Sequence, residues 1–237
     1  MSVAIVTGAS RGLGEAVATG LARAGWSLVV DARDGAALRT AADRIRAAAP
    51  EARVVEVAGD VTDVAHRDAL TDAAVGLGGI DLLVNNAGTL GTSPLPSLAD
   101  YPLDDLRVAF EANVVAPLAL IQEVLPFLID SPHPRVLNVT SDAAVEAYEG
   151  WGGYGAGKAA LEHIGAVLAV EVPALTVWSV DPGDLRTAMH QAAFPGEDIS
   201  DRPEPASVVP AIVALIESRR PSGRYRAAEL APTGAVA

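Results

Sequence analysis

The 237-residue sequence predicts an α/β protein with a single doubly wound parallel sheet and helices on both faces. Short apolar runs alternate with helix-length amphipathic stretches from one end of the chain to the other. Most of these runs are continuous Val, Ile and Leu, which is typical of strands covered on both faces, and each parallel crossover needs a covering helix. No internal repeat, charge block or low-complexity linker divides the chain, so we expect residues 1–237 to form one domain.

Each expected strand is an apolar run that ends at turn-forming residues, and each expected helix is an amphipathic stretch between two such runs. In chain order the expected strands are Val3–Thr7, Ser27–Asp31, Arg53–Val57, Ile80–Asn85, Arg135–Thr140 and Thr176–Asp181, with a weaker one near Arg224–Ala227. The expected helices are Gly12–Ala24, Ala36–Ala48, Val64–Leu77, Leu103–Leu128, Gly153–Val170 and Ser207–Glu217. The Pro- and Gly-rich segment Pro182–Pro205 is expected to be a functional loop with a short helix.

The composition argues against several classes of protein. The formal net charge of −13 argues against binding to nucleic acid or to an anionic membrane surface. The chain has no cysteine, which removes disulfides, thiolate metal sites and a cysteine nucleophile, and its four histidines lack ligand spacing, so we expect no metal site. The first residues lack a signal-peptide pattern and the apolar stretches are short or interrupted, so we expect a soluble, cytoplasmic protein.

A glycine-rich turn follows the first expected strand, at the sheet edge where ligands bind in doubly wound folds. Residues 7–14 read Thr-Gly-Ala-Ser-Arg-Gly-Leu-Gly and run directly into a helix. Glycines allow a tight turn and a close approach to a pyrophosphate, and the helix N-terminus offers free N–H groups to that anion. The spacing differs from the G-x-G-x-x-G of ordinary dinucleotide-binding folds, and a strand-to-helix turn that simply needs glycines is the alternative.

A tyrosine and a lysine four positions apart, Tyr154 and Lys158, follow Ser141 at the end of the fifth expected strand. The spacing places both side chains on one helix face. An ammonium close to a phenol favours the phenolate and lowers its pKa from about 10 toward neutrality, which makes the phenol a general acid or base. Ser141 could hydrogen-bond a substrate oxygen. A surface helix pair is the alternative explanation of the tyrosine and lysine.

With these motifs the chain resembles the short-chain dehydrogenase/reductase family over essentially its whole length, and the resemblance implies a Rossmann fold. The matching motifs occur in the family's order: Thr7–Gly14, Asp60–Val61, Asn85–Gly88, Asn113, Ser141, Tyr154 with Lys158, and Pro182–Thr187.

The resemblance implies catalytic roles for four residues. Tyr154 would donate a proton to a carbonyl or accept one from an alcohol, and Lys158 would lower its pKa and hold the nicotinamide ribose. Ser141 would orient the substrate oxygen, and Asn113 would hold a water that links Lys158 to solvent. An amide inside a helix can free a backbone carbonyl for such a water, although a satisfied buried Asn is the alternative.

The resemblance also implies a cofactor site. Asp60 and Val61 would contact the adenine, and the backbone of Leu185 together with Thr187 would hold the carboxamide. The full expected set is Thr7, Gly8, Ser10, Arg11, Gly12, Leu13, Gly14, Arg33, Asp60, Val61, Asn85, Ala87, Gly88, Tyr154, Lys158, Pro182, Gly183, Leu185 and Thr187.

The charged residues at the end of the second expected strand can be interpreted in two ways, and the two interpretations select different nicotinamide cofactors. Asp31 would bind a ribose 2′-hydroxyl and select NAD, whereas Arg33 and Arg11 would pair with a 2′-phosphate and select NADP. In NAD-preferring family members the acid usually occupies the position of Ala32, and arginines at positions equivalent to 11 and 33 are typical of the NADP group. We therefore expect NADP, with NAD as the alternative.

The substrate side is less defined. Tyr148 and Trp151 lie close to Tyr154 and form either a pocket wall or a packed loop, and residues 183–205 correspond to the family's substrate lid. The lid offers four candidate contacts: Leu185, Met189, His190 and Phe194. Residues 223–228, Gly-Arg-Tyr-Arg-Ala-Ala, depart from the apolar last strand and glycine pair usual in the family, which puts that strand in doubt.

The function that follows is hydride transfer between NADP(H) and a small carbonyl or alcohol substrate. A catalytically silent NAD(P)-binding regulatory or interaction protein is the second hypothesis, and the intact Ser141, Tyr154 and Lys158 argue against it. A related epimerase or dehydratase is the third hypothesis. Such enzymes typically have a longer C-terminal substrate domain and a G-x-x-G-x-x-G loop, and both features argue against this hypothesis for the present chain. The family usually associates through helices equivalent to Leu103–Leu128 and Gly153–Val170, so we expect a homodimer or homotetramer.

Overall fold

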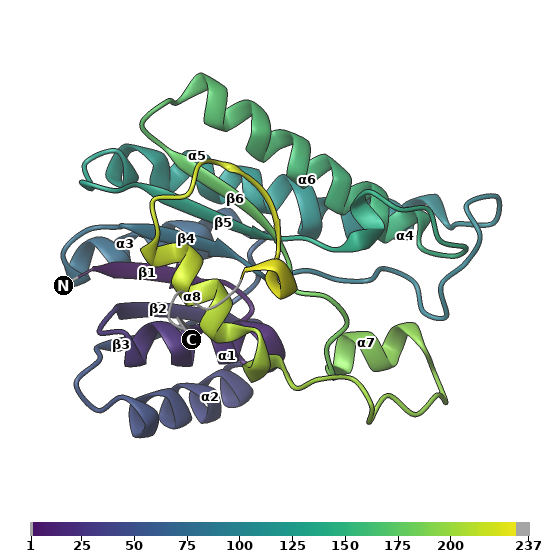
Figure 1. The fold of residues 1–237 in the computed structure, drawn as a ribbon, viewed down its shortest axis with the longest axis horizontal. Helices are drawn as coiled ribbons and strands as arrows, with labels where there is room; N and C mark the ends of the chain where they lie inside the picture. The colour runs from purple at the N-terminus through teal and green to yellow at the C-terminus, as the bar shows by residue number, and fades with distance from the viewer. Residues whose placement is uncertain (1, 231–237) are drawn as a thin grey trace, which may run out of the picture.

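The computed structural model describes residues 2–230 and shows a seven-stranded, wholly parallel sheet with helices on both faces (Figure 1). The strand order is β3-β2-β1-β4-β5-β6-β7, so the order reverses between β1 and β4. The expected doubly wound parallel fold is therefore confirmed. The strands are β1 Val3–Val6, β2 Ser27–Ala32, β3 Val54–Ala58, β4 Leu82–Asn85, β5 Arg135–Val139, β6 Thr176–Asp181 and β7 Gly223–Arg226.

Two layers of helices cover the sheet. On one face lie α1 (Gly12–Arg23), α2 (Gly35–Ala48) and α8 (Val209–Glu217), and α8 crosses in front of the strands in Figure 1. On the other face lie α3 (Val64–Leu77), α5 (Ala116–Leu128) and α6 (Gly152–Glu171). Two shorter helices, α4 (Leu103–Phe110) and α7 (Ala188–Ala193), stand near the carboxyl ends of the strands.

Successive residues of the central strands enter opposite apolar layers, which explains the continuous apolar runs in the sequence. Ile5 of β1 packs in the layer with α3 and α5, whereas Val6 packs in the layer with α1 and α8. Leu82 and Leu83 of β4 divide in the same way. A strand covered on both faces has no solvent side, so it carries no alternating polar residues.

The helix expected over Leu103–Leu128 is divided in the structure. A π-helical segment, Glu111–Val115, separates α4 from α5 and contains Asn113. A π-helical turn inserts an extra residue into the helix and loosens its backbone hydrogen bonding, often at functional sites. The combined helix is long and apolar enough to cross a membrane by length and composition alone. However, Leu120, Ile121 and Val124 are fully buried against the sheet, as in the core helix of a globular protein.

The last strand is present although its sequence is weak. β7 pairs in parallel with β6, and Arg224 lies opposite Ser179. The polar strand is held by side chains as well as by the backbone ladder: the Trp178 indole N–H donates to the carbonyl of Pro221, and Ser222 Oγ accepts from the Val177 N–H. Strong side-chain anchoring at the start of β7 substitutes for the apolar packing that its sequence lacks.

Candidate active site

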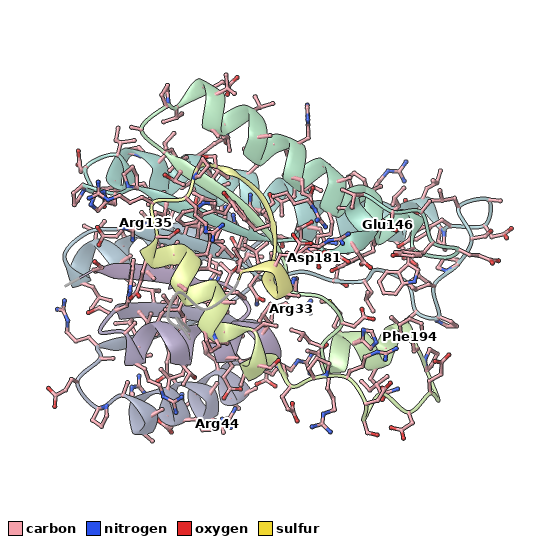
Figure 2. All side chains as sticks on the ribbon, viewed as in Figure 1. Arg33, Arg44, Arg135, Glu146, Asp181 and Phe194 are labelled. Carbon is pink, nitrogen blue, oxygen red and sulfur yellow. The ribbon has the colours of Figure 1, made fainter. Side chains whose placement is uncertain are left out.

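A cleft of about 1930 Å³ runs along the carboxyl ends of the strands, where the strand order reverses. The glycine-rich turn, the ends of β2, β5 and β6 and the segment around α7 all line it. Figure 2 shows Arg33, Asp181 and Phe194 on the side of the sheet that faces α7. Of the expected site residues, the cleft lining contains Gly8, Ser10, Arg11, Gly12, Leu13, Arg33, Asp60, Val61, Ala87, Gly88, Ser141, Tyr154, Lys158, Pro182, Gly183, Leu185 and Thr187.

The glycine-rich turn has the geometry of an anion cradle. Gly8 and Gly12 have φ of 68° and 61°, a left-handed conformation that side chains disfavour. A Cβ on Gly14 would lie 2.4 Å from the Gly8 carbonyl oxygen, so the third glycine permits the helix to pack on the turn. Arg11 precedes α1 without capping it through its side chain, which leaves the first N–H groups of α1 available to an anion.

Thr7 does not line the cleft, but its side chain joins the start of the glycine-rich turn to the segment that follows β4. Its Oγ1 accepts from the N–H groups of Asn86 and Ala87, each at 3.0 Å, and donates to the Val84 carbonyl at 3.2 Å. The Asn86 amide nitrogen donates to the carbonyl oxygens of Thr7 and Gly8. Asn86 therefore clamps the turn, a role that sequence reasoning did not assign to it.

Asn85 lies inside the sheet and not in the cleft lining. Its Nδ2 donates to Asn138 Oδ1 at 2.9 Å, between β4 and β5, and its side chain is buried. Strand alternation explains the difference, because consecutive residues at a strand end point to opposite sides. Asn86 and Ala87 line the cleft, and the expected contact between Asn85 and a cofactor stays a prediction.

Asp31 is buried beneath the glycine-rich turn. Its Oδ1 accepts from the Gly8 N–H at 2.7 Å, and its Oδ2 lies 3.0 Å from His66 Nε2 on α3. Burial raises the Asp31 pKa, and the hydrogen bonds from His66 and Gly8 oppose that shift. Both oxygens are engaged by the protein, so Asp31 supports the turn rather than offering a free acceptor to a ribose. The pairing with His66 was not predicted, because the two residues lie 35 positions apart.

Arg11 and Arg33 stand at the end of the cleft near β2. Within residues 2–230, neither guanidinium forms a salt bridge, and both side chains are exposed. Burial disfavours the charge of Asp60, but hydrogen bonds from Thr62 and the charges of Arg33 and His66 outweigh this and lower the Asp60 pKa. Two exposed arginines beside the glycine-rich turn suit a phosphate.

Tyr154 and Lys158 lie on one face of α6, as the spacing predicted. Lys158 Nζ stands 5.6 Å from the centre of the Tyr154 ring and donates to the Val139 carbonyl at 2.8 Å. Burial raises the Tyr154 pKa, with smaller contributions from the charges of Asp142 and Asp181. Burial also lowers the Lys158 pKa to about 8. The expected lowering of the Tyr154 pKa is not found, because both groups are removed from water and Lys158 points to Val139.

Asn113 is buried, and both its side-chain oxygen and its side-chain nitrogen form a hydrogen bond. Its Oδ1 accepts from the Thr89 N–H and its Nδ2 donates to the Thr89 carbonyl, both at 2.8 Å. A Cβ on Gly88 would lie 2.8 Å from Asn113 Oδ1 and 3.7 Å from Lys158 Nζ. Glycine at this position therefore lets the π-helical segment, the β4 loop and α6 meet. Asn113 fixes that loop, and its role with a water stays a prediction.

Ser141 is hydrogen-bonded to its neighbour Asp142. Ser141 Oγ donates to Asp142 Oδ1 at 2.9 Å and accepts from the Ala143 N–H at 3.2 Å. Tyr148 O–H donates to Asp142 Oδ2 at 3.0 Å, which raises the Tyr148 pKa. The sequence analysis did not single out Asp142, although an acid beside the candidate serine is a visible signal.

A chain of aromatic rings forms the wall beyond Tyr154. Trp151 packs edge-on against Tyr154 with ring centres 5.7 Å apart, and Phe194 lies 5.9 Å from Trp151. His190 of α7 follows at 4.9 Å from Phe194. Trp151 belongs to this wall, whereas Tyr148 is 44% exposed and is tied to Asp142.

The sequence model of the short chain dehydrogenase family matches residues 2–198. The chain belongs to this family. Sepiapterin reductase of Mus musculus is 37% identical to this dehydrogenase over 202 residues, which cover 81% of this chain and 77% of that protein. This likeness and the family match together make the chain an oxidoreductase of the short-chain dehydrogenase type.

Solved structures of the family have the same fold as this dehydrogenase. A short-chain dehydrogenase from Shigella flexneri, complexed with NADP, has a TM-score of 0.89 and 29% identity, over 96% of this chain and 97% of that one. A short-chain dehydrogenase from Escherichia coli CFT073, complexed with NADPH, has a TM-score of 0.87 and 29% identity, over 95% of this chain and 96% of that one.

The dehydrogenase has one further charged cluster at the end of β6 that the sequence did not reveal. Arg224 of β7 donates to Glu162 of α6 at 3.1 Å, to Asp181 at 2.9 Å and to the Ser141 carbonyl at 3.2 Å. Thr140 Oγ1 donates to Glu162 at 2.6 Å. The arginine that departs from the family's last strand therefore ties β7 to the strand ends and the helix that carry the candidate catalytic residues.

Proposed function

We propose that this dehydrogenase is an NADP(H)-dependent carbonyl reductase or alcohol dehydrogenase with Tyr154 as its general acid and base. The observation that carries the proposal is the convergence of Ser141, Tyr154 and Lys158 on one cleft that also contains two arginines without salt bridges among residues 2–230. A buried phenol that keeps its proton near neutral pH can protonate a carbonyl oxygen, and a buried ammonium can stabilise the phenolate that remains.

The residues of the cleft fit a nicotinamide dinucleotide. The uncapped N-terminus of α1 and the positive-φ glycines suit the pyrophosphate, and Asp60 and Val61 line the adenine end. Leu185, Thr187, Tyr154 and Lys158 line the same cleft, and a Cβ on Gly12 of the glycine-rich turn would lie 3.6 Å from Thr187 Cγ2. A bound nicotinamide supplies or accepts the hydride, while the chain supplies placement and the proton.

The contacts of the charged residues near the end of β2 favour NADP over NAD. Both oxygens of Asp31 are engaged by Gly8 and His66, so the acid that would select NAD is occupied. Arg11 and Arg33 line the same end of the cleft and are exposed, and guanidinium groups bind phosphate well. The NADP(H) complexes of the Shigella and Escherichia relatives agree with this choice.

Residues 183–205 are proposed to act as a lid over the substrate. The segment carries α7 and contributes Leu185, Met189, His190 and Phe194 to the cleft lining. Arg186 pairs with Glu204, which ties the two ends of the segment together. A lid of this kind excludes water from the reacting atoms when substrate is bound.

A panel of aldehydes, ketones and alcohols with NADP(H) and NAD(H) tests the proposal, with Tyr154→Phe as the matched variant. We expect reduction with NADPH by the wild type and at least a hundredfold lower kcat for Tyr154→Phe, since general acid catalysis contributes about 10²–10⁴-fold. NADPH affinity, measured by fluorescence titration, should change less than about threefold, because Phe removes only one hydroxyl.

Three outcomes contradict the proposal. Full activity of Tyr154→Phe would remove Tyr154 from the mechanism. NADPH binding without turnover on the whole panel would favour the silent binding protein. A tenfold preference for NADH would overturn the assignment of Arg11 and Arg33.

A further inference from the structure

The proton of the Ser141 hydroxyl is already used within the protein. Ser141 Oγ donates to Asp142 Oδ1 at 2.9 Å and accepts from the Ala143 N–H at 3.2 Å. A hydroxyl has one proton and two lone pairs. Ser141 therefore keeps one lone pair and has no second proton, so in this arrangement it presents an acceptor to the cleft.

Asp142 adds further hydrogen-bond acceptors beside Ser141 in the cleft. Its Oδ1 accepts from Ser141 and from the Ala143 N–H at 2.8 Å, and its Oδ2 accepts from Tyr148 at 3.0 Å. A carboxylate has about four lone-pair sites, so three bonds leave one of them available. Asp142 is half-buried and lines the cleft beside Ser141.

A simple ketone is poorly matched to the hydrogen-bond acceptors of Ser141 and Asp142. Its oxygen is only an acceptor, so it would have to compete with the Asp142 carboxylate for the Ser141 proton. Hydrogen bonds to an ionised acceptor are roughly twice as strong as neutral ones. A simple ketone would therefore be held mainly by the Tyr154 hydroxyl, with Ser141 contributing little.

We propose that Asp142 makes the site selective for carbonyls that carry a hydroxyl on the adjacent carbon, that is, α-hydroxy ketones and aldehydes. This inference rests on the proposed function. The carbonyl oxygen accepts from Tyr154, while the neighbouring hydroxyl donates to the acceptors on Ser141 and Asp142. The carbonyl carbon gains a hydride from NADPH and its oxygen gains the Tyr154 proton, so a vicinal diol and NADP⁺ form. Tyr154 then regains its proton from solvent.

The remainder of the substrate is expected to be flat and apolar. Trp151, Phe194 and His190 form a continuous ring wall that starts at Tyr154. Aromatic faces bind planar groups by offset or edge contacts. A ketone with an aryl group on the far side of the carbonyl therefore places its ring against this wall and its α-hydroxyl toward Asp142.

Matched aryl and alkyl ketones test the proposal. The aryl set is 2-hydroxyacetophenone, 2-methoxyacetophenone and acetophenone, and the alkyl set is 3-hydroxy-2-butanone, 3-methoxy-2-butanone and 2-butanone. The methoxy compounds keep an oxygen at the same position but cannot donate a hydrogen bond. We expect the wild type to prefer the hydroxy over the methoxy ketone by about 10-fold or more in kcat/KM, the range for one hydrogen bond to a charged group.

Asp142→Ala should remove this preference. We expect its hydroxy-to-methoxy ratio to fall within about threefold of one, because the charged acceptor is gone. Its kcat/KM for acetophenone should rise, since Ser141 regains a free proton for the carbonyl oxygen. A purely structural role of Asp142 predicts a loss with every ketone. A change in the Tyr154 pKa would affect both ketones equally and would cancel in the ratio.

Glu146→Gln is the control for the loss of one negative charge. Glu146, labelled in Figure 2, pairs with Arg226 at 3.3 Å and has a side chain that is 52% exposed. This variant should keep the wild-type ratio. Three outcomes would overturn the selectivity inference while leaving the proposed function intact. They are a hydroxy-to-methoxy ratio near one in the wild type, an unchanged ratio in Asp142→Ala, and activity on other carbonyls but on neither hydroxy ketone. No turnover of any carbonyl in the panel would instead overturn the proposed function.

Discussion

Burial of Lys158 makes the reduction depend on pH at the scale of one residue. Its pKa is lowered to about 8, so the ammonium is present below that pH and is lost above it. Tyr154 has a raised pKa and keeps its proton throughout this range. In the proposed mechanism, reduction requires the phenol proton and a positive charge that stabilises the resulting phenolate, so we expect only the Lys158 titration to limit the rate.

We therefore expect kcat/KM for carbonyl reduction at saturating NADPH to be level from pH 6 to 7.5. Above pH 8 it should fall by about tenfold per pH unit, as for a single deprotonation. Circular dichroism over the same range controls for unfolding. A rate that stays level or rises through pH 9.5 would show that the Lys158 charge is not required.

The position of Arg33 in the cleft leads to a prediction about the choice between NADPH and NADH. It lines the cleft near the β2 end without a salt bridge among residues 2–230. Arg33→Ala should raise the KM for NADPH by about 10- to 100-fold, the range for one charge-assisted hydrogen bond pair, and leave the KM for NADH nearly unchanged. Arg39→Ala, an exposed arginine of α2 outside the cleft lining, is the control. Equal changes for both cofactors would place Arg33 away from the 2′-phosphate.

Among the elements, β7 depends on one arginine for its attachment. Arg224 pairs with Asp181 and Glu162, whose side chains are only 5% and 15% exposed. Arg224→Met would remove the ion-pair partner of Glu162 and the nearer of the two arginines that pair with Asp181, the other being Arg226 at 3.8 Å. Removing one partner of a buried pair costs about 3–5 kcal/mol. We expect a fall of about 2–4 kcal/mol in the free energy of unfolding by urea, because the pair is partly solvated.

Arg226→Met is the comparison for this prediction. Arg226 lies on the same strand, pairs with Glu146 at 3.3 Å and reaches Asp181 at the longer distance of 3.8 Å, and its own side chain is 44% exposed. Exposed pairs contribute about 0–1 kcal/mol, so this variant should remain close to the wild type. Equal effects of the two substitutions would mean that β7 is held by its backbone ladder and not by Arg224.

The elements were largely predictable from the sequence, because apolar runs and amphipathic spacing depend on neighbours along the chain. The π-helical segment was not, since it arises where Asn113 binds both backbone groups of Thr89, 24 residues away. The same limit applies to the site. The spacing of Tyr154 and Lys158 was visible in the sequence, whereas the contacts of Asp31 and Arg224 depend on how distant strands and helices meet.

For the whole molecule, the acidic net charge contrasts with two arginines at the β2 end of the cleft. The chain carries a formal net charge of −13, yet the end of the cleft at β2 presents Arg11 and Arg33 without salt bridges among the described residues. A pair of guanidinium groups can bind a small anion in a protein whose overall charge repels large polyanions. The composition argues against nucleic-acid binding, whereas the two arginines fit the proposed anionic cofactor.

The outer surface of α4, α5 and α6 carries apolar side chains that the described chain leaves exposed. Val115 is 48% exposed, Val167 is 40% exposed and Val170 is 78% exposed, with further exposed apolar residues at Leu103, Val108 and Phe127. Exposed apolar side chains on neighbouring helices are typical of an interface where they form one continuous surface. We propose that a second copy of the chain packs here, as expected for the family, and that the protein is a homodimer or homotetramer.

The double variant Val115→Glu with Val167→Glu tests this assembly. Burying two carboxylates at the centre of the interface should shift the mass measured by light scattering to that of a single chain, because unpaired buried charges cost several kcal/mol each. Val75→Glu on α3, where valine is 42% exposed, makes the same chemical change elsewhere and should leave the mass unchanged. A wild type that already scatters as a single chain at micromolar concentration would contradict the proposal. Retention of the larger mass by the double variant would place the interface on another face, and β7 would then be the next surface to substitute.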